Sequence, residues 1–288
     1  MGPYLVRRVL ALLPVMAVVV TIVFLLIHLI PGDPVSVMLG PDATPTQIEK
    51  TRQALGLDRP VTRALWERAE PTLVLTGLAL LVAVIIGVPS GTIAAAYRGS
   101  LWDRGLMFVS LLGVCIPGFW LSLNLIYLFA VRLGWLPAAG YVSIFSDPAA
   151  GLRYMVLPAL SLGFNQSALI ARIARSCMLE VLQQDYIRTA RAKGLSNRVV
   201  IYVHAFRNAL VPVVTVIGIT TAVLIGGAVV TEIVFNIPGL GRLIISAILR
   251  RDYPVVQGVV LVTAATYVLI NLTVDLLYAV IDPRIRYE

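Results

Sequence analysis

The chain has 288 residues, of which 59% are hydrophobic and only 13% charged, and its formal net charge is +8. So small a share of charged residues excludes an ordinary soluble domain and is typical of a protein that crosses a membrane several times. The positive charge does not call for nucleic acid as a ligand, because the placement of the membrane spans accounts for it.

Six stretches of the sequence are apolar and long enough to cross a bilayer, which takes about 20 helical residues. The predicted spans are Val9–Ile30, Pro71–Tyr97, Gly105–Val131, Tyr154–Ala171, Asn208–Thr231 and Tyr253–Val274. The sequence therefore predicts an all-α integral membrane protein with six transmembrane helices.

The distribution of charge predicts the orientation of these spans. With the N-terminus inside the cell, the cytoplasmic segments carry 13 Lys and Arg residues against 5 acids, and the outside segments carry 10 against 9. Positive charge collects on the cytoplasmic side of membrane proteins, so both termini are predicted to be cytoplasmic. The first apolar run is too long for a signal-peptide core, and residues 1–30 are interpreted as a retained anchor and first span.

An extracytoplasmic loop is expected over residues 31–70, before a core of five further spans in residues 71–288. In the loop, Thr46 is a candidate N-cap of a short helix, with Glu49 three residues later and Gly56 as its stop. After the fifth span, the stretch "FNIPGLGRLIISAILRRDYP" has an apolar centre that is too short to cross the membrane. It is predicted to form an interfacial or re-entrant helix at the outer face.

No catalytic constellation or metal site is visible in the sequence. The chain contains no Gly-Lys dipeptide, which excludes a phosphate-binding loop of the G-x-x-x-x-G-K-[ST] kind and ATP hydrolysis by that route. We therefore expect no catalytic residue, no metal ligand and no cofactor bound by this chain.

A gradient-driven transporter usually carries ionisable groups near the membrane midplane, and here the candidates are few. Asp275 lies toward the inner end of the sixth span, where a basic neighbour or interfacial water is favoured as its partner over a transport role. Glu232 lies at the outer end of the fifth span, where lining a pathway and forming a structural ion pair are equally supported. The candidate pathway residues are Glu232, Asn165, Gly226 and Thr220. A gradient-driven transporter, or a membrane anchor without a transport role, remain alternatives.

A basic segment within residues 180–210 interrupts the apolar runs between the fourth and fifth spans. Asp185 to Lys193 is predicted as a helix that Gly194 ends, and Ser196 or Asn197 is a candidate cap of a second helix. The apolar residues of that second helix that share a face are Val199, Val203, Phe206 and Leu210. This elbow either lies on anionic headgroups or serves as a docking lever for a cytoplasmic protein.

The motifs of this segment resemble those of a known family. "DYIRTARAKGL" followed by "HAFRNALVP" is similar to the cytoplasmic loop of ABC importer permeases of the peptide-type subfamily. "HLIPGDP", "GLDRP", "FNIPGLGRL", "RDYPVVQG" and "DLLYAVIDPRIR" resemble the same subfamily, so the similarity covers nearly the whole chain. The chain most resembles the B-type permease subunits of dipeptide and oligopeptide importers, and nickel and glutathione importers belong to the same subfamily.

The resemblance implies a type I ABC importer permease fold and a coupling helix seated in a cleft of an ATPase subunit. Arg188, Thr189, Ala190 and Gly194 match the family signature, although two of its three leading residues differ. Arg207 stands where the general signature has a proline. The implied coupling residues are Asp185, Tyr186, Arg188, Thr189, Ala190, Lys193, Gly194 and Arg198.

The resemblance also implies a set of partners in the inner, cytoplasmic membrane of a bacterium. These are a second homologous permease, two ATPase subunits that hold ATP and Mg, an extracytoplasmic substrate-binding protein, a peptide substrate and membrane lipid. Nucleic acid is not among them. One departure is the outer segment between "GLDRP" and "TLVLTGLAL", where only "VTRALWERAEP" remains of what is usually a longer stretch.

Overall fold

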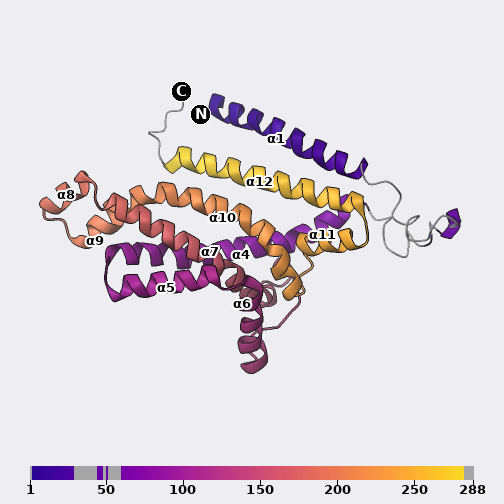
Figure 1. Ribbon diagram of the computed structural model, residues 1–288, viewed down its shortest axis with the longest axis horizontal. Coiled ribbons are helices and arrows are strands. Elements are labelled where there is room, and N and C mark those ends of the chain that lie inside the picture. Colours follow the sequence, from indigo (N-terminus) through magenta and orange to yellow (C-terminus); the bar gives the residue numbers. More distant parts are fainter. Residues whose placement is uncertain (1, 29–43, 48–49, 51–59, 282–288) are drawn as a thin grey trace.

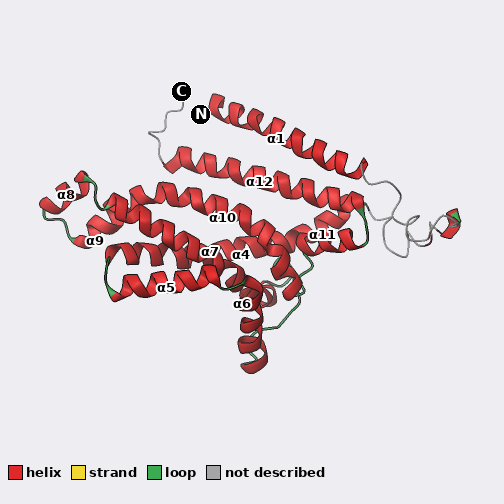
Figure 2. Cartoon of the chain, viewed as in Figure 1, coloured by secondary structure: helices red, strands yellow, loops and turns green. Residues whose placement is uncertain are grey.

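The computed structural model describes residues 2–28, 44–47, 50 and 60–281, and this part of the chain is helical without a strand (Figure 2). The main helices are α1 (Gly2–His28), α4 (Val61–Ala96), α5 (Leu101–Cys115), α6 (Gly118–Leu125), α7 (Pro148–Val181), α8 (Asp185–Ala192), α9 (Asn197–Val199), α10 (Phe206–Val234), α11 (Leu240–Leu249) and α12 (Tyr253–Ile281). Two π-helical stretches, η1 (Ile126–Arg132) and η2 (Val200–Ala205), continue α6 and precede α10.

The long helices account for the predicted spans. Four of them are apolar and long enough to cross a membrane, namely Val61–Ala96, Pro148–Val181, Asn197–Val234 and Tyr253–Val274. A pair of helices, Leu101–Cys115 and Gly118–Arg132, is bent by 103° at its break and is long and apolar enough to form a fifth crossing when the two are taken together. The first predicted span falls in α1, whose apolar stretch Leu13–Leu25 is shorter than the other crossings and runs beside α12 (Figure 1). The chain is thus an all-helical multi-pass membrane protein, as its composition predicts.

The prediction of Gly105–Val131 as one continuous span is wrong. The helix stops at Cys115, because the residue before a proline avoids helical dihedrals and Pro117 has no N–H to donate. A new helix starts at Gly118 and leaves the bundle at a steep angle (Figure 1). Pro117 marks the break in the sequence, but the bend also depends on the hydrogen bonds that the neighbouring helix, α7, makes to the backbone at the break.

Polar side chains of α7 satisfy the backbone at this break. The Asn165 Nδ2 atom donates to the Ile116 carbonyl at 3.0 Å, and Ser161 Oγ donates to the Gly118 carbonyl at 3.3 Å. Ser161 also shares a 2.6 Å hydrogen bond with Ser122 of α6. A membrane interior supplies no water for such groups, so these contacts stabilise the broken crossing.

Small residues bring α4 and α7 into close contact at the centre of the bundle. A Cβ atom on Gly91 would lie 2.3 Å from the Ala171 carbonyl oxygen, and one on Gly163 would lie 2.5 Å from that of Ala79. Close backbone approach of this kind drives helix association in lipid, where the hydrophobic effect between helices is missing. The tightly packed pair of α4 and α7 therefore forms the centre of the bundle, and other helices pack against it.

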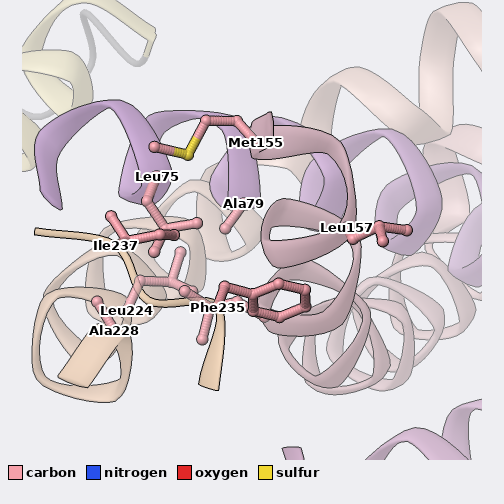
Figure 3. Close-up of a cluster of buried hydrophobic side chains, with 9 residues drawn as sticks. Leu75, Ala79, Met155, Leu157, Leu224, Ala228, Phe235 and Ile237 are labelled. Atoms are coloured by element: carbon pink, nitrogen blue, oxygen red, sulfur yellow. The ribbon is translucent and has the colours of Figure 1, made fainter. Parts of the chain in front are cut away.

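A hydrophobic cluster joins α4, α7 and α10 (Figure 3). It consists of Leu75, Ala79, Met155, Leu157, Leu162, Leu224, Ala228, Phe235 and Ile237. Phe235 and Ile237 follow α10 directly, so the chain leaving this helix turns back into the core before α11 begins. Along the length of the bundle, α8 and α9 lie toward one end and α11 toward the other (Figure 1). We call these the α8 end and the α11 end.

The short helix of the loop begins two residues earlier than predicted. The Thr44 N–H donates to Gln47 Oε1 at 2.9 Å, and the Thr44 hydroxyl donates to the same oxygen at 3.0 Å. Thr44 with Gln47 thus takes the capping position predicted for Thr46 with Glu49. Glu49 and the predicted stop at Gly56 lie outside the described residues.

The α4–α7 contact can be tested with one substitution at two glycines of α4. We expect Gly91→Ala to lower the free energy of unfolding by about 1–3 kcal/mol, because its Cβ would overlap the α7 backbone. Gly77→Ala is the matched control, since a Cβ there meets nothing within 4 Å. It is expected to be neutral or mildly stabilising. Thermal unfolding of both variants in detergent measures the difference, and equal stability would contradict the close contact.

Candidate functional site

The predicted basic helix is present as α8, and local sequence sets both of its ends. Asp185 lies in its first turn and Arg191 in its last, where each charge interacts favourably with the helix dipole. Gly194 follows with a φ of +79°. Its N–H donates to the Arg191 carbonyl at 2.9 Å, and the Leu195 N–H donates to the Ala190 carbonyl at 3.4 Å. This is a Schellman turn, and it confirms the prediction that Gly194 ends the helix.

One face of α8 is buried in the bundle. Ile187 has no exposed surface and Ala190 is 8% exposed, so this face is held firmly. Their neighbours come from the ends of α4 and α7 and from the start of the α10 crossing, and they are Ala95, Met178, Val200, Ile201, Ala205 and Ala209. A side-chain hydrogen bond adds to this packing, because Asn208 Nδ2 donates to the Tyr186 hydroxyl at 2.9 Å. The buried face of α8 thus packs mainly on η2, at the start of the α10 crossing, within a cluster that also includes residues of α4 and α7.

The other face of α8 and the turn after it are exposed and rich in charge. The exposed residues are Asp185, Tyr186, Arg188, Thr189, Arg191, Lys193, Gly194 and Arg198. Asp185 and Arg188 form an ion pair at 3.3 Å, but their side chains are 94% and 75% exposed, so the pair contributes little to stability. We call this surface the coupling face. The structure thus gathers the sequence-predicted coupling residues at one end of the molecule, with Ala190 facing inward beneath them.

The second helix of the predicted elbow is not a separate helix. α9, η2 and α10 form one crossing over Asn197–Val234. Ser196 stands at the N-cap position but its side chain makes no capping hydrogen bond. The predicted apolar face is also wrong, because Val203 is 58% exposed while Val200, Ile201, Ala205 and Ala209 are buried. The π-helical turns of η2 add a residue per turn, which shifts the buried face away from the 3.6-residue period used for the prediction.

Glu232 lies in the last turn of α10 and has no exposed surface. One of its carboxylate oxygens accepts a hydrogen bond from Thr72 Oγ1 of α4 at 2.5 Å, and the other accepts the backbone N–H of Arg242 at 2.9 Å. Thr72 Oγ1 in turn accepts the Leu240 N–H at 2.8 Å. These contacts pair amide groups that the first turn of α11 would leave without acceptors. We call them the Glu232 clasp, and they join α4, α10 and α11.

Two glycines in "PGLGRL" make the clasp possible. A Cβ on Gly239 would lie 2.1 Å from a carboxylate oxygen of Glu232, and one on Gly241 would lie 2.6 Å from the Val229 Cα atom. Only residues without a side chain allow the α11 backbone to approach so closely. The clasp holds Glu232 at a helix terminus by hydrogen bonds to α4 and α11. The two roles predicted for it, a structural ion pair and a place at the outer mouth of a pathway, stay predictions.

The other candidate pathway residues occupy three different environments. Asn165 contacts the break after α5, as described above, and its Oδ1 atom is buried without a hydrogen-bond partner among the described residues. The Thr220 hydroxyl is likewise buried and unpaired within that part of the chain. Gly226 is exposed on α10, with open space where a Cβ would be. Their assignment to a pathway stays a prediction, and the Asp275 side chain lies outside the described set.

Sequence reasoning missed an ion pair at the α8 end. Arg175 of α7 donates to both carboxylate oxygens of Asp103 at 2.6 and 2.8 Å, and the Gly99 N–H donates to the same carboxylate at 2.9 Å. The pair connects the α4–α5 turn to α7, close to where α7 leads into α8. The available signal in the sequence was the spacing of Ser100 and Asp103, which is typical of the start of a helix. Nothing local in the sequence points to Arg175.

A second missed contact lies at the α11 end. Tyr141 donates to a carboxylate oxygen of Glu70 at 2.6 Å, and Ser143 donates to the same oxygen. Burial, together with this hydrogen bond to Glu70, raises the pKa of Tyr141 well above its ordinary value, so the phenol keeps its proton and remains a donor. The contact ties the connection between η1 and α7 to α4. No group of three His, Cys, Asp or Glu residues that could hold a metal ion occurs in the described part of the chain.

Comparison with known protein families identifies the family of this chain. The family described as "Binding-protein-dependent transport system inner membrane component" matches residues 87–287, and its N-terminal companion matches residues 1–78. The chain belongs to this family of transport permeases. It is therefore a membrane-spanning permease subunit of ABC importers and a multi-pass protein of the inner membrane.

Curated relatives cover the permease from end to end. A putative peptide transport system permease protein of Brucella abortus is 44% identical over 314 aligned residues, which include all of both chains. A dipeptide transport system permease protein of Alkalihalophilus pseudofirmus is 41% identical, and a glutathione transport system permease protein of Escherichia coli K12 is 40% identical, each covering 99% of both chains.

Solved structures support the fold. An inward-facing form of the MetNI methionine ABC transporter matches with a TM-score of 0.64 at 20% identity, covering 78% of this permease and 99% of that chain. An amino acid ABC transporter with histidines matches with a TM-score of 0.55 at 18% identity, covering 78% of this chain and 95% of that one. At such identities the likeness shows the fold alone, and it confirms the predicted type I importer permease fold.

The Glu232 clasp predicts a loss of stability when one of its acceptor oxygens is replaced by a donor group. In Glu232→Gln, an NH₂ group replaces one of the two acceptor oxygens of the carboxyl group. Either Thr72 Oγ1 or the Arg242 N–H, both buried donors of the clasp, would then lose its acceptor. We expect the free energy of unfolding of the permease to fall by about 1–3 kcal/mol. Glu67→Gln is the control, because Glu67 is half-exposed and pairs with Arg63 one turn earlier on the surface of α4, and it is expected to be nearly neutral. Denaturant unfolding in detergent compares the two, and a neutral Glu232→Gln would contradict the clasp.

The Asp103–Arg175 pair predicts energetic coupling between the two side chains. In a double-mutant cycle of Asp103→Asn and Arg175→Gln, we expect an interaction of about 1–2 kcal/mol, at the lower part of the usual range because Arg175 is 27% exposed. The same cycle on Asp185 and Arg188, an exposed pair, is expected to show almost none. Equal coupling in the two cycles would show that burial of the first pair adds nothing.

Proposed function

We propose that this permease forms the translocation pathway of an ATP-driven importer of dipeptides and oligopeptides, together with a second homologous permease. The observation that carries the proposal is the coupling face. α8 presents an exposed charged surface at one end of the molecule while its apolar side is buried in a cluster with residues of three crossings. A helix built in this way can receive a partner protein and transmit its movement to the bundle.

The partner proposed for the coupling face is an ATPase subunit. This chain carries no phosphate-binding loop, so ATP and Mg would be held by two ATPase subunits and not by the permease. The Schellman turn at Gly194 is open, with nothing within 4 Å of the position that a Cβ would take. The coupling face would move with the closing ATPases, and the paired permeases would switch between inward-open and outward-open states.

The proposed orientation places the α8 end in the cytoplasm. The cytoplasmic assignment rests on the excess of Lys and Arg in the segments at that end. α1 begins and α12 ends toward the same end of the bundle as α8, which supports cytoplasmic termini (Figure 1). The α11 end would then face outward and receive the extracytoplasmic substrate-binding protein.

The proposed substrate class follows the names of the relatives, which are called peptide, dipeptide and glutathione transport permeases. Peptides differ widely in side chain, so their pathway needs little selectivity of its own, and selection falls to the binding protein. Nickel and glutathione, whose importers belong to the same subfamily, are the alternative cargoes.

Uptake by the purified complex in proteoliposomes tests the function. We expect a labelled dipeptide to enter only when ATP and the binding protein are both present, and uptake to continue after a protonophore collapses the proton gradient. Uptake that fails with the protonophore while ATP is held constant would show a gradient-driven transporter instead. ATP-driven uptake of glutathione or nickel, but of no peptide, would correct the substrate class and leave the mechanism standing.

The coupling face predicts a specific defect at Gly194. Gly194→Trp adds bulk where a partner's cleft would close, and we expect ATP-driven uptake to fall at least about tenfold while membrane insertion persists. Gly194→Asn is the matched control, because asparagine tolerates the left-handed conformation with a small side chain, and it should keep most of the uptake. Copurification of the ATPase subunits is measured in parallel. Normal uptake by Gly194→Trp would remove Gly194 from the coupling surface.

A further inference from the structure

A hollow of about 370 Å³ lies between α5 and α7, near the α8 end and apart from the coupling face. It is lined by Met107, Leu169, Arg172, Ile173, Arg175 and Ser176. Arg172 and Ser176 are exposed, so the hollow opens to the surroundings of the bundle. Its lining combines apolar side chains with two guanidinium groups, and this composition fits a ligand that has an apolar part and an anionic part.

The charge of the hollow is not neutralised from within. Arg175 already donates to both oxygens of Asp103, and Gly99 takes up more of the same carboxylate. Arg172 makes no hydrogen bond or ion pair with the described part of the chain. One full positive charge therefore remains at the mouth of the hollow and favours an anion there.

The length of α7 places this charge at a membrane surface. Between Arg153 and Arg172 this helix carries no charged residue. These 18 residues span about 27 Å at ~1.5 Å per residue, close to the roughly 30 Å of a hydrocarbon core. We therefore place Arg172 in the headgroup layer at the α8 end. Met107 lies about 9 Å along α5 from the start of that helix at Leu101. This places it in the hydrocarbon layer, close to the headgroups at the α8 end.

The surface beside the hollow favours a lipid over a soluble anion. Phe108, Val109 and Leu112 of α5 are exposed, as expected of a surface in contact with acyl chains. Tyr97 and Trp102 are exposed at the start of this region, and such aromatic side chains concentrate at the boundary between hydrocarbon and water. A basic pocket between helices on the cytoplasmic side suits the headgroup of an acidic lipid.

We propose that the hollow binds one anionic phospholipid of the phosphatidylglycerol kind. Its phosphate would contact Arg172 and the exposed edge of Arg175, and the first carbons of its acyl chains would lie on Met107, Leu169 and Ile173. The proposal depends on the membrane position of the hollow and not on the cargo of the importer, so it stands or falls separately from the proposed function.

The test uses the complete complex, stripped of lipid in a mild detergent and titrated with labelled lipids. Phosphatidylglycerol is expected to bind about fivefold more tightly than phosphatidylcholine with the same label, which is the effect of roughly one interfacial cation. Arg172→Gln should abolish this preference, and Arg172→Lys should keep most of it. Arg104→Gln is the matched control, because Arg104 is exposed at the same end but does not line the hollow, and it should keep the preference.

A second variant acts without changing charge. Ser176→Trp fills the hollow, and it should weaken phosphatidylglycerol binding as much as Arg172→Gln does. Equal losses in Arg104→Gln and Arg172→Gln would mean that diffuse charge attracts the lipid. An unchanged preference in both Arg172→Gln and Ser176→Trp would mean that another subunit covers the hollow or that no lipid enters it. Displacement of the lipid by millimolar inorganic phosphate would assign the site to a soluble anion. Each of these three results overturns the proposal.

Discussion

The constraint on which this structure depends is the lack of water inside a membrane, where every backbone N–H and C=O group needs a partner within the protein. Long helices satisfy this requirement along their length by their own backbone hydrogen bonds. Other hydrogen-bond partners are needed only where a helix breaks or begins. At the break after α5, Asn165 donates to the freed Ile116 carbonyl, and Ser161 donates to the carbonyl of Gly118, where α6 begins. At the start of α11, Thr72 and Glu232 accept the amides. Several buried polar groups of this apolar chain thus lie where its helices break or begin.

With the backbone satisfied, packing through small residues decides which helices lie against one another. α7 lies against α4 through glycine contacts and carries the Asn165 contact to the break, the Arg175 contact to the α4–α5 turn and the Met178 contact to α8. The coupling face is therefore connected to a rigid pair of helices and, through Asn208, to the α10 crossing. The same arrangement explains how a short surface helix can act on the whole bundle.

The sequence predicted much of the coupling face and little of what supports it. The charges of α8 and the turn at Gly194 depend on residues within one turn of each other, so the local pattern was sufficient. The apolar face around Val203 was wrong, because a period of 3.6 residues does not anticipate π-helical turns. The straight third span was wrong as well. Pro117 marks a break, but its angle is set by α7, which comes later in the chain.

By itself the sequence determined the apolar runs, the side that collects positive charge, the amphipathic α8 and the shortness of α11. Each of these depends on composition or spacing within one segment, and the membrane converts such composition directly into position. Tertiary structure alone decided the partners of the buried carboxyl groups. Glu232 meets Thr72 across 160 residues, and Asp103 meets Arg175 across 72. No local pattern encodes these pairs, because helices distant in the chain become neighbours only when small residues let their backbones meet.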